Sequence, residues 1–476
     1  MKKFTKIVAT VSDKRCDVDF IKALSEAGVN VVRMNSAHLD LEGFTRIVNN
    51  VREADPSLAI IMDTKGPEIR TTVTVGDTPI EYQPGTEVSV CGDPEGITSS
   101  DKICLNYSRI AECLHPGDRM LIDDGELAFE ILSVNGDKVT ARAENYGRLG
   151  SRKSVNLPGV KVDLPAVTER DKRNIGYAVD LGVDFIAHSF VRSAADVCQV
   201  KEILSSLGSD AQVISKIENQ EGIDNFDEIL AASYGIMVAR GDLGIEVAAE
   251  RIPGMQSMMI DKCIKAHKPV IVATQMLHTM IEHPRPTRAE ISDVANAVYQ
   301  RADAMMLSGE TAYGKYPLEA VRTMTNVARE VESSLRTKMY VPPLVDANTT
   351  TFLSREAVKS EHIVGTKAIF TDSFRGLTAR LISSFRGNNP TFAICHNLEV
   401  SRLLALSYGI TAYYDRSTHM SDMPGSYPRY SISALREIVA QGYLSPDDRV
   451  AYLTGTAKGV RALEILTPEE LFAAEK

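Results

Sequence analysis

The sequence predicts an α/β protein, namely a TIM (β/α)8 barrel with an inserted β-barrel lid domain and a C-terminal α/β domain. Three observations predict this fold. Short apolar runs recur along the chain, helical patterns lie between them, and polar residues follow most of the runs. The apolar runs are eight in number, as a TIM barrel requires: Lys6–Ala9, Asn30–Met34, Ala59–Met62, Asp184–His188, Gln212–Ser215, Gly235–Val238, Pro269–Ala273 and Ala304–Leu307.

The stretches between these runs have the apolar spacing of amphipathic helices, which indicates a parallel sheet with helical crossovers. The expected helices are Asp17–Ala27, Leu41–Glu53, Ala194–Leu207, Gly254–Ala266, Arg288–Arg301 and Leu318–Leu335. A doubly wound sheet would show the same alternation. The closed barrel is favoured because polar clusters follow the C-terminal ends of the runs, where TIM barrels build their sites.

The alternation breaks once and then ends, which divides the chain into three domains. From about residue 71 to 165, short β-type segments separated by Gly, Pro and Asp turns replace the helices. This insertion leaves the barrel at the C-terminal end of a strand and should overhang the barrel mouth as a lid. We therefore expect the barrel at 1–70 and 166–338, the lid at 71–165, and an α/β domain with a candidate regulatory role at 339–476.

Composition excludes several classes of protein. The 476-residue chain carries a net charge of -10, which argues against a general nucleic-acid binder. No apolar run approaches the ~20 residues of a membrane span. The seven cysteines are scattered without any CxxC pair, so neither a disulfide framework nor a structural zinc site is indicated. We expect a cytoplasmic protein without a membrane or nucleic-acid partner.

Two carboxylates, Glu218 and Asp242, follow successive expected strands and should lie close together above the barrel. Such a pair suits a hard divalent cation such as Mg²⁺. A helix cap at Asp242 and a solvated loop at Glu218 are the alternatives. Lys216 lies two residues before Glu218, on the same side of an extended strand. It could stabilise a transferring phosphoryl group, form a Schiff base, or simply pair with Glu218.

Arg33 and Asn35 alternate in the same way on the second run, and Asp63 and Lys65 on the third. Together with Arg70 and Lys216, Arg33 would form an anion pocket within an acidic protein, because the arginine fork matches phosphate. Thr274 ends the seventh run, where it could be functional or an ordinary buried hydroxyl.

A third polar cluster opens the C-terminal domain. The segment TDSFRGLT at 371–378 follows a strand and begins a helix, where backbone amides and hydroxyls can hold phosphate. An ordinary helix cap explains it equally well. The candidate effector-loop residues are Thr371, Ser373, Arg375 and Thr378.

Several longer motifs resemble one family, the pyruvate kinases. They include MDTKGPEIR at 62–70, SKIENQEG at 215–222, MVARGDLGIE at 237–246, ATQML at 273–277, PRPTRAE at 284–290 and MLSGETA at 306–312. They occur in family order across about the first 335 residues. The resemblance implies transfer of phosphate from phosphoenolpyruvate to ADP, giving ATP and pyruvate in the last step of glycolysis.

The resemblance also implies roles for individual residues. Glu218 and Asp242 would bind Mg²⁺ or Mn²⁺, and Lys216 and Arg33 would handle the phosphoryl group. The amides of Gly241 and Asp242 and the hydroxyl of Thr274 would hold the substrate carboxylate, and Thr274 would help to deliver the proton. The nucleotide-side residues are implied to be Arg70, His38 and Lys153, with Asp124 in the closing lid. A homotetramer is expected on the same ground.

The match departs from the family in three places. The residues that hold K⁺ would be Asn35, Asp63 and the Thr64 carbonyl, but Ala37 stands where the family usually has a hydroxyl ligand. Glu68 accompanies K⁺ dependence in the family, so K⁺ is expected with an altered shell that Ser36 or water completes. Residues 10–14 replace the usual opening motif, which puts nucleotide contacts in doubt. Phe374 interrupts the usual effector-loop pattern, so the effector stays unknown.

Two other functions compete with a pyruvate kinase. One is a Schiff-base or metal-dependent aldolase or lyase that uses Lys216 on the same barrel. The other is a non-catalytic regulatory paralogue, against which the presence of Lys216, Glu218, Asp242 and Thr274 argues.

Overall fold

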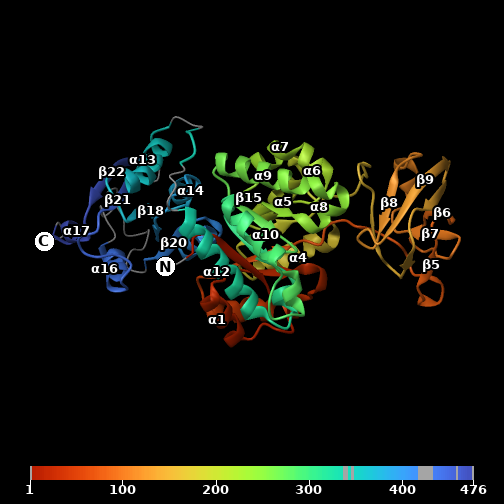
Figure 1. The fold of residues 1–476 in the computed structure, drawn as a ribbon, viewed down its shortest axis with the longest axis horizontal. Helices are drawn as coiled ribbons and strands as arrows, with labels where there is room; N and C mark the ends of the chain where they lie inside the picture. Colours follow the sequence, from red (N-terminus) through yellow and green to blue (C-terminus); the bar gives the residue numbers. More distant parts are fainter. Residues whose placement is uncertain (1–2, 336–340, 345–347, 416–431, 457–458, 474–476) are drawn as a thin grey trace.

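The computed structural model describes residues 3–335, 341–344, 348–415, 432–456 and 459–473. A helix-clad barrel lies in the middle, a β domain at one end of it and an α/β domain at the other (Figure 1). The expected boundary between barrel and C-terminal domain, at residues 338 and 339, lies outside the described residues. Within the described part of the chain, no helix is long and apolar enough to span a bilayer.

The central body is a closed barrel of parallel strands in the order β1-β17-β16-β15-β14-β13-β3-β2. Its strands are β1 Lys6–Thr10, β2 Val31–Asn35, β3 Ala59–Asp63, β13 Phe185–His188, β14 Gln212–Ile217, β15 Gly235–Ala239, β16 Val270–Ala273 and β17 Ala304–Leu307. The expectation of a closed barrel in place of a doubly wound sheet is therefore confirmed.

Strand alternation explains how the barrel presents its chemistry. Side chains two residues apart on a strand face the same way. Each barrel strand therefore points one side chain into the middle of the barrel and the next inward side chain toward the C-terminal mouth. In four strands the middle inward residue is buried and apolar: Val8, Val31, Ile61 and Ile214. Two positions further on, the residue is polar in each case: Thr10, Arg33, Asp63 and Lys216.

Helices cover the outside of the barrel and bury a second apolar layer against the strands. The longer ones are α1 Val18–Ala27, α2 Leu41–Ala54, α4 Glu169–Asp180, α5 Ala194–Ser206, α9 Ile252–Lys265, α10 Arg288–Tyr299 and α12 Pro317–Leu335. A capping box begins α10, because the side chains of Thr287 and Glu290 each accept a hydrogen bond from the backbone amide of the other.

The insertion between β3 and β13 is a β domain. A seven-stranded sheet has the order β4-β12-β8-β9-β10-β6-β7, and β5 and β11 form a separate pair. These strands are β4 Ile69–Arg70, β5 Ile80–Tyr82, β6 Glu87–Gly92, β7 Lys102–Leu105, β8 Arg119–Ile122, β9 Leu127–Asn135, β10 Lys138–Ala143, β11 Gly147–Leu149 and β12 Ser154–Asn156. The bridge between Thr71 and Leu105 brings the first and last strands together, so the sheet curves round into a barrel.

The C-terminal body is a five-stranded sheet in the order β20-β19-β18-β21-β22. Its strands are β18 Ala368–Ser373, β19 Thr391–Cys395, β20 Ile410–Tyr414, β21 Val450–Thr456 and the antiparallel edge strand β22 Gly459–Leu466. The helices that accompany it are α13 Thr349–Ile363, α14 Leu377–Ser384, α15 Leu398–Leu403, α16 Ile432–Ala440 and α17 Pro468–Ala473. It packs against the end of the barrel at which the strands begin.

Buried ion pairs join these two bodies. Arg386 reaches Asp303, just before β17, with Nη1 to Oδ1 at 3.0 Å and Nη2 to Oδ2 at 2.7 Å. Arg402 contacts Asp184, just before β13, at 2.6 Å. Leu406 is buried with the apolar residues of the barrel interior. The C-terminal domain therefore closes the barrel end opposite the lid.

Candidate active site

The four inward polar side chains at the barrel mouth form one network with Glu218. Arg33 Nη2 lies 2.6 Å from Asp63 Oδ2, and Lys216 Nζ lies 3.2 Å from the same oxygen. Lys216 Nζ also lies 2.8 Å from Glu218 Oε1. Thr10 Oγ1 accepts a hydrogen bond from Arg33 and donates one to the Leu307 carbonyl. The structure thus brings Arg33 and Lys216 of the expected anion pocket together around Asp63. The third expected member, Arg70, lies on β4 and pairs with Glu68.

These charges are almost fully buried, so each depends on its neighbours. Burial lowers the pKa of the Lys216 ammonium, but the charges of Glu218, Asp63 and Asp242 outweigh burial and leave that pKa raised. Burial raises the pKa of Asp63, but Arg33 and Lys216 outweigh it and leave that pKa lowered. Lys216 is therefore a charged ammonium. It pairs with Glu218, which was one of the alternatives that the sequence left open.

The carboxylates of Glu218 and Asp242 interact across the mouth. Burial raises the pKa of Glu218, and the charge of Asp242 raises it further against the opposing effect of Lys216. The other Glu218 oxygen, Oε2, accepts a hydrogen bond from the Phe190 amide at 2.7 Å. Asp242 lies in the first turn of α8 Arg240–Glu246. Two adjacent carboxylates that repel one another are a donor set that fits a hard divalent cation.

Thr274 lies just beyond β16 with φ of 69°, an unusual conformation for a β-branched residue. Its hydroxyl donates to the Ala273 carbonyl at 2.6 Å and accepts from the Gly241 amide at 2.7 Å. Arg240, which the sequence reasoning missed, fixes this corner by donating to the Thr274 carbonyl at 2.8 Å and to Asp293 at 2.7 Å. Strained backbone held by several partners is typical of functional sites.

The residues expected to hold K⁺ lie beside this network. Asn35 Oδ1 accepts a hydrogen bond from the Ala37 amide at 3.1 Å, at the start of the 3₁₀ turn η1 Ser36–His38. The Thr64 carbonyl accepts one from Ser189 Oγ at 2.7 Å. Ser36 Oγ and Asp63 Oδ1 are buried and have no hydrogen-bond partner. Oxygen atoms of this kind are suitable ligands for a monovalent cation.

Ser189 is a second residue that the sequence reasoning missed. Its hydroxyl accepts a hydrogen bond from Lys216 Nζ at 2.8 Å and donates to the Thr64 carbonyl. It directly follows His188, which is buried with 1% of its surface exposed. The one signal available was the position of Ser189 at the C-terminal end of a barrel strand.

The expected nucleotide-side residues lie at the junction with the lid. Arg70 pairs with Glu68 at 2.8 Å, and Lys153 pairs with Asp123 at 2.7 Å. Both cationic side chains are more than a third exposed. His38 ends the turn η1, and its side chain lies outside the described residues.

Asp124, expected in the closing lid, accepts a hydrogen bond from Ser154 at 2.9 Å. The lid also touches α8 through Asn156 Nδ2 and Glu246 Oε1, 3.4 Å apart. The lid therefore borders the barrel mouth, as its point of insertion predicts.

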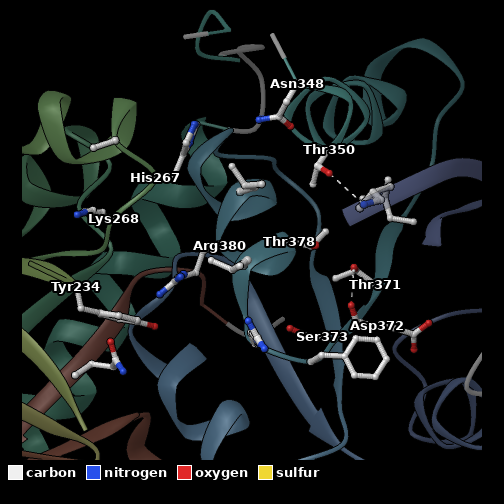
Figure 2. Close-up of a pocket in the computed structure, with 18 of the residues that line it drawn as sticks. Tyr234, His267, Lys268, Asn348, Thr350, Thr371, Asp372, Ser373, Thr378 and Arg380 are labelled. Carbon is white, nitrogen blue, oxygen red and sulfur yellow. Dashed lines mark hydrogen bonds between the residues drawn. The ribbon is translucent and has the colours of Figure 1, made fainter. Parts of the chain in front are cut away.

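A separate cavity of about 1120 Å³ lies between the C-terminal domain and the barrel end opposite the lid. All four candidate effector-loop residues line it, and Figure 2 shows Thr371, Ser373 and Thr378 opposite His267 and Lys268 of the barrel. Ser373 Oγ is buried and has no hydrogen-bond partner. The helix α14 begins at Leu377, and its N-cap residue, Gly376, has no side chain to cap it, so the alternative of an ordinary helix cap is not observed.

Basic side chains surround this cavity, some of them already engaged. Lys268 donates to the carbonyls of Leu230, Ala231 and Ser233 at 2.6 to 2.8 Å. Burial, together with the charges of Lys201 and Arg380, lowers the pKa of Lys268 to about 8. The Arg380 guanidinium lies over the Tyr234 ring, 4.4 Å from its centroid. The cavity is therefore suited to an anion.

Fold and site together define a class. A TIM barrel with a carboxylate pair, a charged buried lysine and an arginine at its C-terminal mouth is a metal-assisted enzyme of anionic substrates. Comparisons with known proteins identify the family. Residues 2–321 match the family model described as pyruvate kinase, barrel domain, and residues 352–465 match that described as pyruvate kinase, alpha/beta domain.

Similar proteins cover nearly the whole chain. The pyruvate kinase of Borreliella burgdorferi is 42% identical, over 98% of this chain and 98% of its own. Pyruvate kinase 2 of Candida glabrata is 39% identical over 96% and 92%. The crystal structure of a pyruvate kinase from Cryptosporidium parvum superposes with a TM-score of 0.91 at 35% identity, covering 98% and 96%. The chain belongs to the pyruvate kinase family.

Members of this family are transferases that convert phosphoenolpyruvate and ADP to pyruvate and ATP. They generally use a divalent metal ion and K⁺. The expected family, fold and reaction are thereby confirmed.

Proposed function

We propose that Lys216, Arg33, Glu218 and Asp242 form the centre at which the phosphoryl group passes from phosphoenolpyruvate to ADP. The observation that carries the proposal is the position of Lys216 Nζ, which lies 2.8 Å from Glu218 and 3.2 Å from Asp63, carboxylates that raise its pKa. A Schiff-base lysine must become a neutral amine, whereas charge stabilisation needs the ammonium. This environment favours phosphoryl transfer over the aldolase alternative.

In the transfer, the bond between phosphorus and the enol oxygen breaks, and a bond from phosphorus to an oxygen of the ADP β-phosphate forms. Lys216 and Arg33 would stabilise the negative charge on the phosphoryl oxygens as the group moves, exchanging their present contacts with Asp63 and Glu218 for those oxygens. The amides of Gly241 and Asp242 and the hydroxyl of Thr274 would orient the substrate carboxylate. Thr274, through water, would pass a proton to the enolate carbon.

Glu218 and Asp242 would hold Mg²⁺ or Mn²⁺, which would supply positive charge to the substrate oxygens when bound. The mutual repulsion of these carboxylates supports the assignment. Asn35, Asp63 and the Thr64 carbonyl would hold K⁺, with the buried Ser36 hydroxyl in place of the ligand that Ala37 lacks.

On the nucleotide side we propose Arg70, Lys153 and His38. Arg70 and Lys153 leave part of their charge exposed at the junction of barrel and lid, where a diphosphate could replace their carboxylate partners. A homotetramer in the cytoplasm, with domains bounded at 70, 165 and 338, completes the proposal.

The decisive experiment measures the ADP-dependent loss of phosphoenolpyruvate with Mg²⁺ and K⁺, in the wild type and in Lys216→Met. We expect the variant to retain its far-ultraviolet circular dichroism and to lose about 10²- to 10³-fold in kcat, the effect of removing one electrostatic donor. Near-normal turnover by the folded variant would contradict the role. Borohydride trapping of Lys216 with pyruvate would instead favour the aldolase.

We also propose that Thr371, Ser373, Arg375 and Thr378 bind an anionic effector in the cavity of Figure 2. The buried, unpartnered hydroxyl of Ser373 supports a polar ligand there. A panel of sugar phosphates in the turnover assay tests this role. Arg375→Ala should abolish any activation and leave the basal rate unchanged, and activation that survives the substitution would place the effector elsewhere.

A further inference from the structure

Two thiols lie side by side in the lid domain, outside the site at the barrel mouth. Cys91 on β6 and Cys104 on β7 are direct partners in the parallel register of these strands. Their sulfur atoms are 3.5 Å apart. Cys104 is fully buried and Cys91 is partly exposed, so the pair can be reached from one side.

A carboxylate completes the cluster. Asp93 follows β6 by one residue, and one of its oxygens and the two sulfur atoms all lie within 4.8 Å of one another. Gly96 packs closely against Asp93 and Cys104, where no larger residue fits without displacing them. A Cβ atom at this position would lie 2.5 Å from Asp93 Oδ2 and 2.7 Å from Cys104 Sγ.

We propose that Cys91, Cys104 and Asp93 bind a thiophilic divalent cation of the Zn²⁺ type, with water as the fourth ligand. Tetrahedral zinc binds thiolate sulfur at about 2.3 Å, which places two such sulfur atoms roughly 3.8 Å apart. The observed separation needs only a small adjustment. The Asp93 side chain is 46% exposed, so the fourth position faces solvent.

The types of ligand distinguish this site from the carboxylate pair at the barrel mouth. Thiolates select soft and borderline ions, whereas carboxylates alone select Mg²⁺. Lys102 Nζ lies 3.7 Å from Asp93 Oδ2 and competes with the ion.

The cluster is attached to the segment that carries the chain into the lid. The Cys104 carbonyl accepts a hydrogen bond from the Thr72 amide at 2.9 Å. The Cys104 amide donates to Thr98 Oγ1 at 3.1 Å, and that oxygen lies 3.0 Å from Thr72 Oγ1. A bound ion would therefore fix the β6–β7 turn to this segment and protect both from hydrogen exchange.

Titration of the reduced full-length protein with Co²⁺ tests the proposal, because thiolate-to-cobalt charge transfer absorbs in the near ultraviolet and carboxylate ligation does not. We expect one equivalent to produce this band in the wild type and Zn²⁺ to displace it. Cys91→Ser should remove the band, and Asp93→Asn should weaken binding at least tenfold. Lys102→Met, which removes the competing cation, should tighten it.

Cys198→Ser is the matched control, since Cys198 is an exposed thiol on α5 with no role in the cluster. It should bind Co²⁺ as the wild type does. Turnover of phosphoenolpyruvate with Mg²⁺ should be unchanged in Cys91→Ser, which shows that the variant is folded. A wild type without the band, or a band that persists in folded Cys91→Ser, would overturn the proposal.

Discussion

Lys216 stays protonated because of its neighbours, since the charges of three carboxylates outweigh the effect of burial on its pKa. Spacing along single strands could predict that Lys216, Glu218, Arg33 and Asp63 face the same mouth, since alternation on a strand is a local rule. The same reasoning could not predict that Asp63 contacts both Arg33 and Lys216, because that contact depends on how β2, β3 and β14 are arranged around the barrel.

Ser189 was missed for the same reason, and its role can be tested. The hydroxyl accepts from Lys216 Nζ and donates to the Thr64 carbonyl, so it fixes the position of the ammonium. Ser189→Ala should lower kcat about tenfold, the value of one hydrogen bond to a charged group, with little change in KM for phosphoenolpyruvate. Ser189→Thr, which keeps a hydroxyl, should restore part of kcat. A change in melting temperature with kcat unchanged would mean a purely structural role.

His188 predicts an acid-sensitive barrel. Burial lowers its pKa to about 4, below the ordinary 6.5, so the unfolded chain binds a proton more readily between these values. His188 thus reduces stability as pH falls from 6.5 to 4, by about 1.4 kcal/mol per pH unit. Denaturant unfolding of the wild type and His188→Gln at pH 7 and pH 5 should show a smaller loss in the variant. Equal losses would contradict this assignment.

At the scale of elements, the eight expected barrel strands and six expected helices are all present, with ends displaced by at most two residues. Apolar periodicity and helix caps depend on residues close in sequence, so they can be predicted from the chain. The lid shows what such local patterns cannot predict. Its β character was predictable from its turns, but the pairing of β12 with β4 and β8 joins segments far apart in the sequence.

The short turn η1 carries the departure from the family at Ala37 and gives a prediction about K⁺. With one hydroxyl missing, activation by K⁺ should be weaker than Glu68 would suggest. Ala37→Ser should strengthen it, measured as turnover with and without K⁺ at constant ionic strength. Ser36→Ala should weaken it further, since the Ser36 hydroxyl is buried without a partner. Strong, saturable activation of the wild type by K⁺ would show that alanine at position 37 does not weaken K⁺ binding.

At the scale of the whole molecule, the order of the three domains could be predicted from changes in composition along the chain. The contacts that hold the domains together could not. Nothing local marks Arg386 or Asp303 as partners, because they lie on different bodies and meet only after both have formed. The Arg386 and Asp303 side chains are 1% and 4% exposed. Asp303 also accepts hydrogen bonds from the amides of Tyr408 and Val270.

This pair predicts how firmly the C-terminal domain is held. Arg386→Leu leaves Asp303 buried without its cation and should reduce stability by about 3 to 5 kcal/mol. Asp303→Asn in the same chain should recover part of the loss, because the uncompensated charge is then removed. Thermal unfolding of the three proteins would measure both effects. Equal stability of wild type and Arg386→Leu would show that the pair contributes little.

The place at which the lid is inserted also constrains how the polypeptide is made. Strand β3 pairs with β13, yet residues 64–184 must leave the ribosome between them. At a synthesis rate of ~5 to 20 residues per second, β13 emerges on the order of ten seconds after β3. During that time β3 has an open edge, a state prone to aggregation. The lid, whose strands are complete before β13 emerges, can finish folding first, so chaperones would meet a folded lid beside an unfinished barrel.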